Sequence, residues 1–181
     1  MADPYVFPTY SIIKNHHGYI TAESEVGVGT KFTLYLPASQ GQAVSETREA
    51  KILSGHGKIL VMDDEVMIQD ITRAMLNKLG YEVEVAGSGD EAVEMFRSAR
   101  ESGRPFDAVL MDLTIPGGMG GKEAVQHIAT IDEGVKAIVS SGYSNDPIMS
   151  QYRNYGFSGM VTKPYDFQKL SSVLHQVLQE R

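Results

Sequence analysis

Residues 108–121, AVLMDLTIPGGMGG, decide the fold, because an apolar run ends at Asp112 and a glycine-rich turn follows it. A short apolar run bounded by turn residues is typical of a strand buried on both faces of a parallel sheet. Similar runs, each ending in polar residues, occur in KILVMDDE (58–65), AIVSSGYS (137–144) and MVTKPY (160–165). We therefore expect several parallel strands whose carboxyl ends carry polar side chains.

Strand and helix patterns alternate five times from Lys58 onward. The expected strands cover residues 58–62, 81–86, 108–111, 137–140 and 159–161. The first segment between strands has apolar residues at helical spacing, namely Ile68, Ile71, Met75 and Leu79. Gly80 is expected to end that helix in the left-handed conformation, and Asp146-Pro147 to begin the fourth. The alternation predicts an α/β fold, a doubly wound five-stranded parallel sheet of flavodoxin-like order 2-1-3-4-5.

The N-terminal part of the chain has a different pattern. Residues 9–17 are predicted as a short helix, and residues 18–24 and 30–36 as the strands of a hairpin. This region holds too few apolar residues for a core of its own, so we expect it to pack on something else or to be poorly ordered. A stretch rich in Ser, Gly, Gln and charge follows and is predicted as a linker. The predicted domains are therefore 1–37, a linker at 38–56, and 57–181.

Composition narrows the class of protein. A hydrophobic content of 42% with 22% charged residues is that of a folded globular chain. The net charge of −7 argues against a nucleic-acid partner, which requires a basic surface. The chain has no cysteine, so thiolate metal sites and disulfides are excluded. No run reaches the roughly 18 apolar residues of a membrane span, so we expect a cytoplasmic protein without membrane contact.

The polar residues that follow the predicted strands suggest one site. Asp63 and Asp64 follow the first strand, Asp112 the third, Ser141 the fourth and Lys163 the fifth. Carboxyl ends of parallel strands face one crevice, where carboxylates that repel one another can share a hard cation, above all Mg²⁺ when phosphate is involved. An aspartate there can act as a nucleophile toward phosphorus, while the metal and the lysine neutralise charge.

Each of these features has a simpler explanation when it is taken alone. Acidic pairs after strands are usually solvated turns or helix caps, and a lysine before proline is usually a surface residue. Their combination at the ends of the predicted strands favours the functional interpretation. His16 and His17 are predicted to be solvated or structural, because Gly18 follows where a kinase phosphoacceptor helix would have an acidic residue.

From Lys58 to about Leu178 the sequence resembles the CheY-like receiver domain of response regulators. The resemblance implies that Asp112 is the phosphoacceptor, with Ser141 and Lys163 beside it. It also implies a Mg²⁺ site of Asp64, Asp112 and the backbone carbonyl of Thr114, with Asp63 reaching the ion through water. Met160 departs from the family pattern, which often has a rotating aromatic residue at that position.

Residues 10–37, YSIIKNHHGYITAESEVGVGTKFTLYLP, resemble the last helix and hairpin of a histidine-kinase ATP-binding domain. The asparagine box and the Asp-x-Gly-x-Gly nucleotide loop of that family do not occur before it, so this chain is not expected to form an ATP site alone. The two resemblances together imply a fragment of a hybrid sensor histidine kinase.

The expected function is that of a phosphorelay receiver, which takes a phosphoryl group from a histidine kinase or a histidine phosphotransfer protein. Independent kinase activity is not expected, apart from Mg²⁺-dependent self-phosphorylation and autodephosphorylation, and homodimerisation stays open. The alternatives are a histidine kinase active in the full-length protein, a phosphatase of the haloacid dehalogenase type and a flavin-binding protein. The phosphatase would need an aspartate where Thr114 stands, and a flavin phosphate would be repelled by the acidic first loop.

Overall fold

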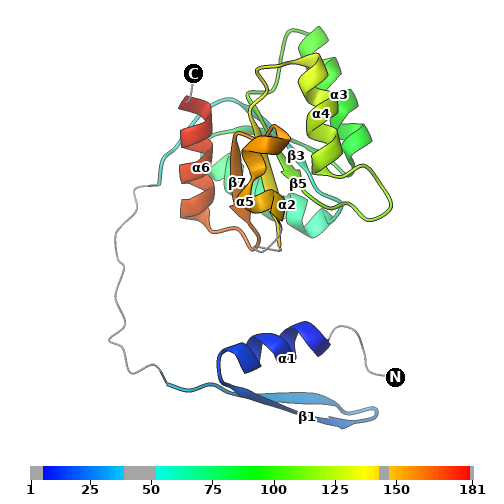
Figure 1. Cartoon of the computed structure of the whole chain (residues 1–181), viewed down its shortest axis with the longest axis vertical. Helices are drawn as coiled ribbons and strands as arrows, with labels where there is room; N and C mark the ends of the chain where they lie inside the picture. The colour runs from blue at the N-terminus through cyan, green and yellow to red at the C-terminus, as the bar shows by residue number, and fades with distance from the viewer. Residues whose placement is uncertain (1–5, 39–51, 143–146, 180–181) are drawn as a thin grey trace. The chain divides into compact units, whose positions relative to one another are not determined.

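The structure is a computed structural model that describes residues 6–38, 52–142 and 147–179 (Figure 1). The chain divides into two compact units, residues 1–48 and residues 49–181, and each is described by itself. Within the described residues, no helix is long and apolar enough to cross a membrane.

The larger unit is built on a five-stranded parallel sheet. Its strands are β3 (Lys58–Met62), β4 (Glu82–Ala86), β5 (Ala108–Asp112), β6 (Ala137–Ser141) and β7 (Gly159–Thr162). They are ordered β4-β3-β5-β6-β7 across the sheet, which is the order 2-1-3-4-5 within this unit. The predicted doubly wound fold is therefore confirmed, and each strand lies within one residue of its predicted bounds.

Helices cover both faces of this sheet. They are α2 (Val66–Lys78), α3 (Gly89–Glu101), α4 (Gly121–Ile131), α5 (Pro147–Ser150) and α6 (Phe167–Gln179), with a 3₁₀ turn, η1, at Tyr152–Tyr155. Gly80 follows α2 with a φ of 99°, in the left-handed region expected for the residue that ends a helix. The predicted fourth helix is short and begins at Pro147, while its predicted cap, Asp146, lies outside the described residues.

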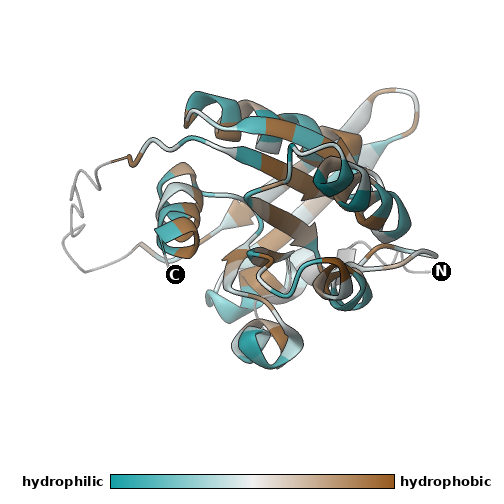
Figure 2. Ribbon diagram, turned by 90° about the horizontal axis from the view of Figure 1, so that it is seen from above, coloured by the Kyte–Doolittle hydropathy of each residue, from teal (hydrophilic) through white to brown (hydrophobic). Residues whose placement is uncertain are grey.

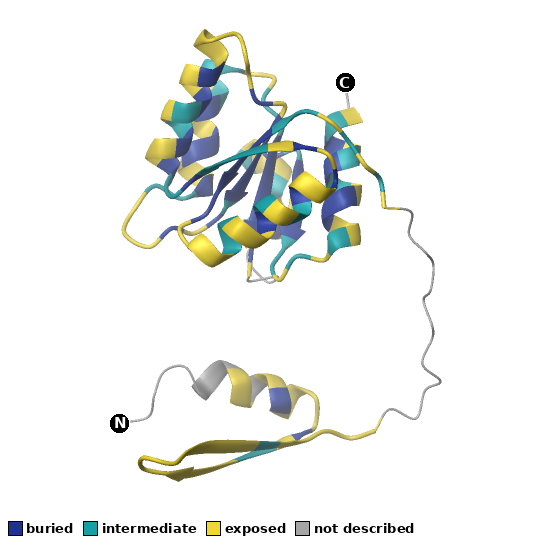
Figure 3. Ribbon diagram, turned by 180° about the vertical axis from the view of Figure 1, so that it is seen from behind, coloured by how far each residue is buried: buried dark blue, intermediate teal, exposed yellow. Residues whose placement is uncertain are grey.

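The sheet separates two hydrophobic cores. Side chains alternate along each strand, so that Val139 packs toward α3 and α4 while Ile138 packs toward α2 and α6. Figure 2 shows hydrophobic residues along these strands, and Figure 3 shows that the strands are the most deeply buried part of the unit. Such double-sided burial explains why β3 and β5 are unbroken apolar runs, whereas the edge strand β4 alternates Glu and Val.

The end of the predicted linker packs on the larger unit. The Leu53 backbone N–H donates to Ser171 Oγ at 2.9 Å, and the same hydroxyl donates to the Leu53 carbonyl at 3.0 Å. The Gly55 N–H donates to the Leu79 carbonyl, and the Tyr81 ring lies so close to Gly55 that an added Cβ would overlap it. Residues 52–57 are thus held between α2, the start of β4 and α6.

The smaller unit consists of helix α1 (Val6–Asn15) and the antiparallel hairpin of β1 (Tyr19–Glu25) and β2 (Gly29–Tyr35). The predicted helix, residues 9–17, begins three residues later than α1 and ends two residues after it. The helix does not reach His17, because this residue has a φ of 56° and so leaves the helical conformation. Ile13 is the one large apolar side chain that is buried among the described residues of this unit. Most of its other apolar side chains are exposed, as the expectation of an insufficient core implies (Figure 3).

Candidate functional site

The polar side chains identified in the sequence converge at the carboxyl edge of the sheet. Asp63 and Asp64 directly follow β3, Asp112 ends β5, Ser141 ends β6 and Lys163 follows β7. The order of the sheet places β3, β5, β6 and β7 side by side, so these residues come from four neighbouring strands. All five predicted side chains therefore lie at one edge, as expected for ligand sites in parallel sheets.

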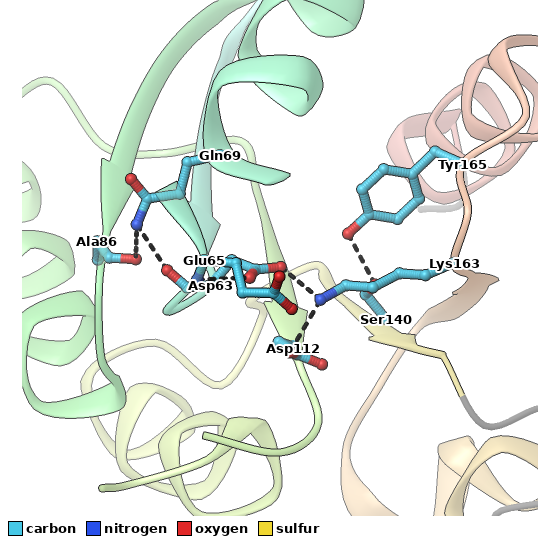
Figure 4. A network of polar contacts seen from close by, with 8 residues as sticks. All are labelled: Asp63, Glu65, Gln69, Ala86, Asp112, Ser140, Lys163 and Tyr165. Carbon is cyan, nitrogen blue, oxygen red and sulfur yellow. Dashed lines mark hydrogen bonds and ion pairs between the residues drawn. The ribbon is translucent and has the colours of Figure 1, made fainter. Parts of the chain in front are cut away.

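Asp63 is the most deeply buried of these groups. Its side chain is 1% exposed, and its Oδ1 accepts a hydrogen bond of 3.1 Å from the Glu65 backbone N–H. Gln69, one turn into α2, donates from Nε2 to the Asp63 carbonyl at 2.6 Å and approaches the Ala86 carbonyl at 3.5 Å (Figure 4). Gln69 thereby ties the end of β3 to the end of β4.

Lys163 bridges two carboxylates. Its Nζ lies 2.6 Å from Asp63 Oδ2 and 2.9 Å from Asp112 Oδ2, and Figure 4 shows the ammonium between them. The side chains of Lys163 and Asp112 are each only 13% exposed. Little solvent screens these charges, so the two ion pairs are stronger than ordinary surface pairs.

The electrostatics of this cluster follow from burial and charge. Burial raises the pKa of Asp112, and the neighbouring Asp63 charge raises it further, while the hydrogen bond and charge of Lys163 and a backbone hydrogen bond from Thr114 work to lower it. The net pKa of Asp112 lies above its ordinary value. Burial works to lower the pKa of Lys163, but its hydrogen bonds to Asp63 and Asp112 outweigh this effect and leave that pKa raised. Lys163 is therefore a firmly protonated cation.

Three carboxylates meet in a way that suits a divalent cation. Asp63, Asp64 and Asp112 each offer an oxygen, and the three oxygens lie within 4.8 Å of one another. One ammonium does not balance three carboxylates, and an oxygen-only ligand set favours a hard ion such as Mg²⁺. The residues present therefore fit a magnesium ion.

A cavity of about 310 Å³ opens beside these carboxylates. It is lined by Asp64, Glu65, Asp112, Thr114, Pro116, Ser141, Gly142 and Lys163. Ser141 is 3% exposed, and its carbonyl accepts a hydrogen bond from the Lys163 backbone N–H at 2.9 Å. Met160 lies on β7 with 41% exposure and is not among the lining residues. The cavity brings carboxylates, a hydroxyl and an ammonium into one small polar space.

Sequence reasoning missed a second layer behind the site. The Tyr165 hydroxyl and Ser140 Oγ lie 2.7 Å apart in a hydrogen bond, and Gln69 braces the backbone of Asp63. The available signals were weak: Tyr165 follows the Lys163-Pro164 pair, and Ser140 precedes the predicted Ser141. His16 and His17 belong to the smaller unit, where both are exposed.

Comparison with known proteins gives the family. Residues 59–175 match the model of the response regulator receiver domain. The sensor kinase CckA of Brucella abortus (strain 2308) is 29% identical over 182 residues, which cover 95% of this chain and 19% of the kinase. The sporulation initiation phosphotransferase F of Bacillus subtilis (strain 168) is 28% identical over 121 residues, which cover 67% of this chain and 93% of that protein.

Solved structures agree with this match. A CheY-like receiver domain protein from Methanospirillum hungatei JF-1 has a TM-score of 0.60 at 27% identity, over 68% of this chain and 94% of its own. The receiver domain of the sensor histidine kinase PA1611 from Pseudomonas aeruginosa PAO1, solved with magnesium coordinated in its active-site cleft, shares the fold with a TM-score of 0.61 at 24% identity, over 70% of this chain and 100% of its own. The chain belongs to the response regulator receiver domain family of two-component signalling.

Proposed function

We propose that Asp112 accepts a phosphoryl group from a phosphohistidine of a histidine kinase or a histidine phosphotransfer protein. The observation that carries this proposal is the position of Lys163, whose ammonium bridges Asp63 and Asp112 at the wall of a polar cavity. A carboxylate oxygen of Asp112 attacks phosphorus, the bond from phosphorus to the imidazole nitrogen breaks, and its electron pair stays on the imidazole. The product is an acyl phosphate on Asp112.

The other residues of the site have distinct roles in this proposal. Asp63, Asp64, Asp112 and the backbone carbonyl of Thr114 would hold Mg²⁺, which when bound supplies charge neutralisation for the phosphoryl oxygens. The Lys163 ammonium exchanges its ion pair with Asp112 for one with a phosphoryl oxygen. The Ser141 hydroxyl donates a hydrogen bond to another phosphoryl oxygen. The change is expected to reach the surface formed by α5, β7 and α6, where Met160 is exposed.

Intact-protein mass spectrometry tests this function. The chain is incubated with acetyl phosphate and Mg²⁺ and compared with a chelated sample and with Asp112→Asn. We expect one added phosphoryl mass that requires both Asp112 and the metal. The proposal fails if the same adduct forms on Asp112→Asn, or if no adduct forms while Mg²⁺ still binds.

A second proposal concerns the smaller unit, which we infer to be the end of a histidine-kinase ATP-binding domain in a longer hybrid kinase. The match to CckA covers 95% of this chain and so extends beyond the receiver match at 59–175. The chain spans 19% of the length of that kinase. An apolar groove between α1 and the hairpin, lined by residues such as Tyr10, Phe32 and Leu34, is the kind of surface that the rest of such a domain would cover.

Nucleotide titration separates this fragment from a working kinase. A single helix and hairpin supply only part of a nucleotide-binding fold, so we expect no saturable binding of Mg²⁺-ATP to this chain and no ATP-dependent phosphate incorporation. Saturable ATP binding would show that the chain holds a complete nucleotide site and would contradict the fragment assignment.

A further inference from the structure

The hydrogen bond between Ser140 and Tyr165 lies directly behind the phosphorylation site. Ser140 Oγ and the Tyr165 hydroxyl are 2.7 Å apart, and either oxygen can be the donor. Ser140 has no exposed surface, and Tyr165 packs against the core between the sheet and helices α2 and α6. Two hydroxyls in an apolar layer require such a partnership, because a buried polar group without one is costly.

Strand alternation places this pair on the same side of the sheet as the charged cluster. Ser140 shares the face of Ile138 on β6, and Asp112 shares the face of Leu110 on β5, both toward α2 and α6. The charges of Lys163 and of the carboxylates also act on the pKa of Tyr165, although burial is the largest cause of its rise. Figure 4 shows the Tyr165 hydroxyl reaching toward Ser140 beside the Lys163 side chain.

The pair also fastens the loop that carries Lys163. Only residues 163–166 connect β7 to α6. The loop is tied to β6 first where the Lys163 N–H donates to the Ser141 carbonyl at 2.9 Å, and again two residues later by Tyr165 and Ser140. Between these two attachments the Lys163 side chain extends to Asp63 and Asp112.

We propose that the Ser140–Tyr165 hydrogen bond positions Lys163, so that Tyr165 is a positioning residue for phosphoryl transfer to Asp112. Tyr165 itself does not touch the reacting atoms. It restricts the loop and thereby limits the rotamers that the Lys163 side chain can adopt. The ammonium is then already placed to contact both carboxylates and, later, the phosphoryl group. The inference rests on the proposed function and adds to it a residue that the motif of the site does not include.

Three variants and a matched control test the proposal in the full chain. Tyr165→Phe and Ser140→Ala each remove one hydroxyl, and the double variant removes both. Tyr81→Phe is the control, because Tyr81 is a buried phenol of the same core, next to the amino end of β4 and away from the site. Melting temperature is measured for all four proteins, and Ser140→Ala carries the test if Tyr165→Phe does not fold.

The first readout is the rate of phosphorylation by acetyl phosphate with saturating Mg²⁺. We expect each single variant to react about tenfold more slowly than wild type, because small displacements of a catalytic group cost on the order of 10- to 100-fold. The double variant should be no slower than the slower single variant, since both changes break the same bond. Rates equal to that of Tyr81→Phe, or effects that multiply in the double variant, would overturn the proposal.

The second readout does not depend on phosphorylation. An ammonium held by two carboxylates should give a resolved Nζ signal in ¹⁵N NMR at neutral pH, assigned by its loss in Lys163→Arg. We expect this signal to broaden or vanish in Tyr165→Phe and Ser140→Ala and to persist in Tyr81→Phe. An unchanged signal in the single variants overturns the positioning role of Tyr165. If wild type takes no phosphoryl group, the proposed function is refuted, and the NMR signal alone then tests whether Tyr165 positions Lys163.

Discussion

Replacing Lys163 by methionine tests whether the ion cluster is held together as its geometry implies. Methionine keeps an unbranched side chain of similar length but removes the ammonium that lies 2.6 Å from Asp63 and 2.9 Å from Asp112. Without metal, this leaves the 1% exposed Asp63 carboxylate uncompensated. Removing one partner of a buried pair costs about 3–5 kcal/mol, and we expect the lower end because Asp112 retains some solvent contact. Domain stabilities are about 5–15 kcal/mol, so this loss is large.

Urea unfolding in the presence of a chelator measures this loss. With a slope of about 2 kcal/mol per molar urea, a loss of about 3 kcal/mol lowers the midpoint by roughly 1.5 M. Adding Mg²⁺ should then reduce the difference in urea midpoint between Lys163→Met and wild type. The variant presents three carboxylates with no competing ammonium, so the cation should stabilise it more than it stabilises wild type. Lys163→Arg, which keeps the charge, is the matched control.

The difference in unfolding free energy between Lys163→Met and wild type should also become smaller in acid. Burial raises the pKa of Asp112 above 3.8, so the folded state holds this proton at a higher pH than the unfolded chain does. Protonation of Asp112 therefore stabilises the folded state. This contribution to the unfolding free energy is present in full below pH 3.8 and is lost as the pH rises through the raised pKa of Asp112. Near neutral pH Asp112 is ionised, so removing Lys163 should lower the unfolding free energy strongly. In acid Asp112 is protonated and the same substitution should cost little. The reasoning is refuted if the penalty of Lys163→Met is below about 0.5 kcal/mol in chelator, a value typical of surface changes, or if Mg²⁺ leaves it unchanged.

Three other substitutions test separate parts of the structure. Asp64→Asn should unfold like wild type in chelator, because Asp64 is exposed, yet lose most of the stabilisation that Mg²⁺ confers in the same urea assay. Ser171→Ala should cost about 1–2 kcal/mol by removing both hydrogen bonds to Leu53, and hydrogen exchange should rise at the Leu53 amide. Gly121→Ala should cost roughly 1–3 kcal/mol, because its Cβ would lie 2.6 Å from the Asp112 carbonyl oxygen; a wild-type melting temperature would contradict that contact.

Most of the sheet could be predicted from the sequence because β3, β5, β6 and β7 come from short apolar runs with a sharp end, whereas the edge strand β4 alternates Glu and Val. Such runs have two buried faces, and their ends coincide with the polar residues of the site. For this reason the placement of Asp63, Asp112 and Lys163 at one edge followed from the strand assignment alone. The structure differs in adding residues such as Asp112 and Ser141 to the ends of their strands and in starting β4 at Glu82 instead of Tyr81.

Other parts of the site depend on contacts that no local pattern encodes. Ser140 and Tyr165 are 25 residues apart, and they meet only because of the path of the loop after β7. Residues 52–57 have the composition of a linker, yet Gly55 allows the backbone to lie against Tyr81. Polar composition predicts exposure, but backbone hydrogen bonds and a missing Cβ decide whether such a segment packs.

Charge balance explains why lysine and metal are both required in the proposed function. Asp63, Asp64 and Asp112 bring three negative charges together, and Lys163 offsets one of them. The remaining two charges would repel a phosphoryl group, which carries negative charge of its own, but they equal the charge of one divalent cation. Lys163 therefore keeps the buried carboxylates compatible with the fold before metal binds, and a divalent cation makes the pocket neutral enough for a phosphoryl donor to approach. A second lysine in place of the metal would leave one negative charge uncompensated, so the charge balance favours a divalent ion in the proposed function.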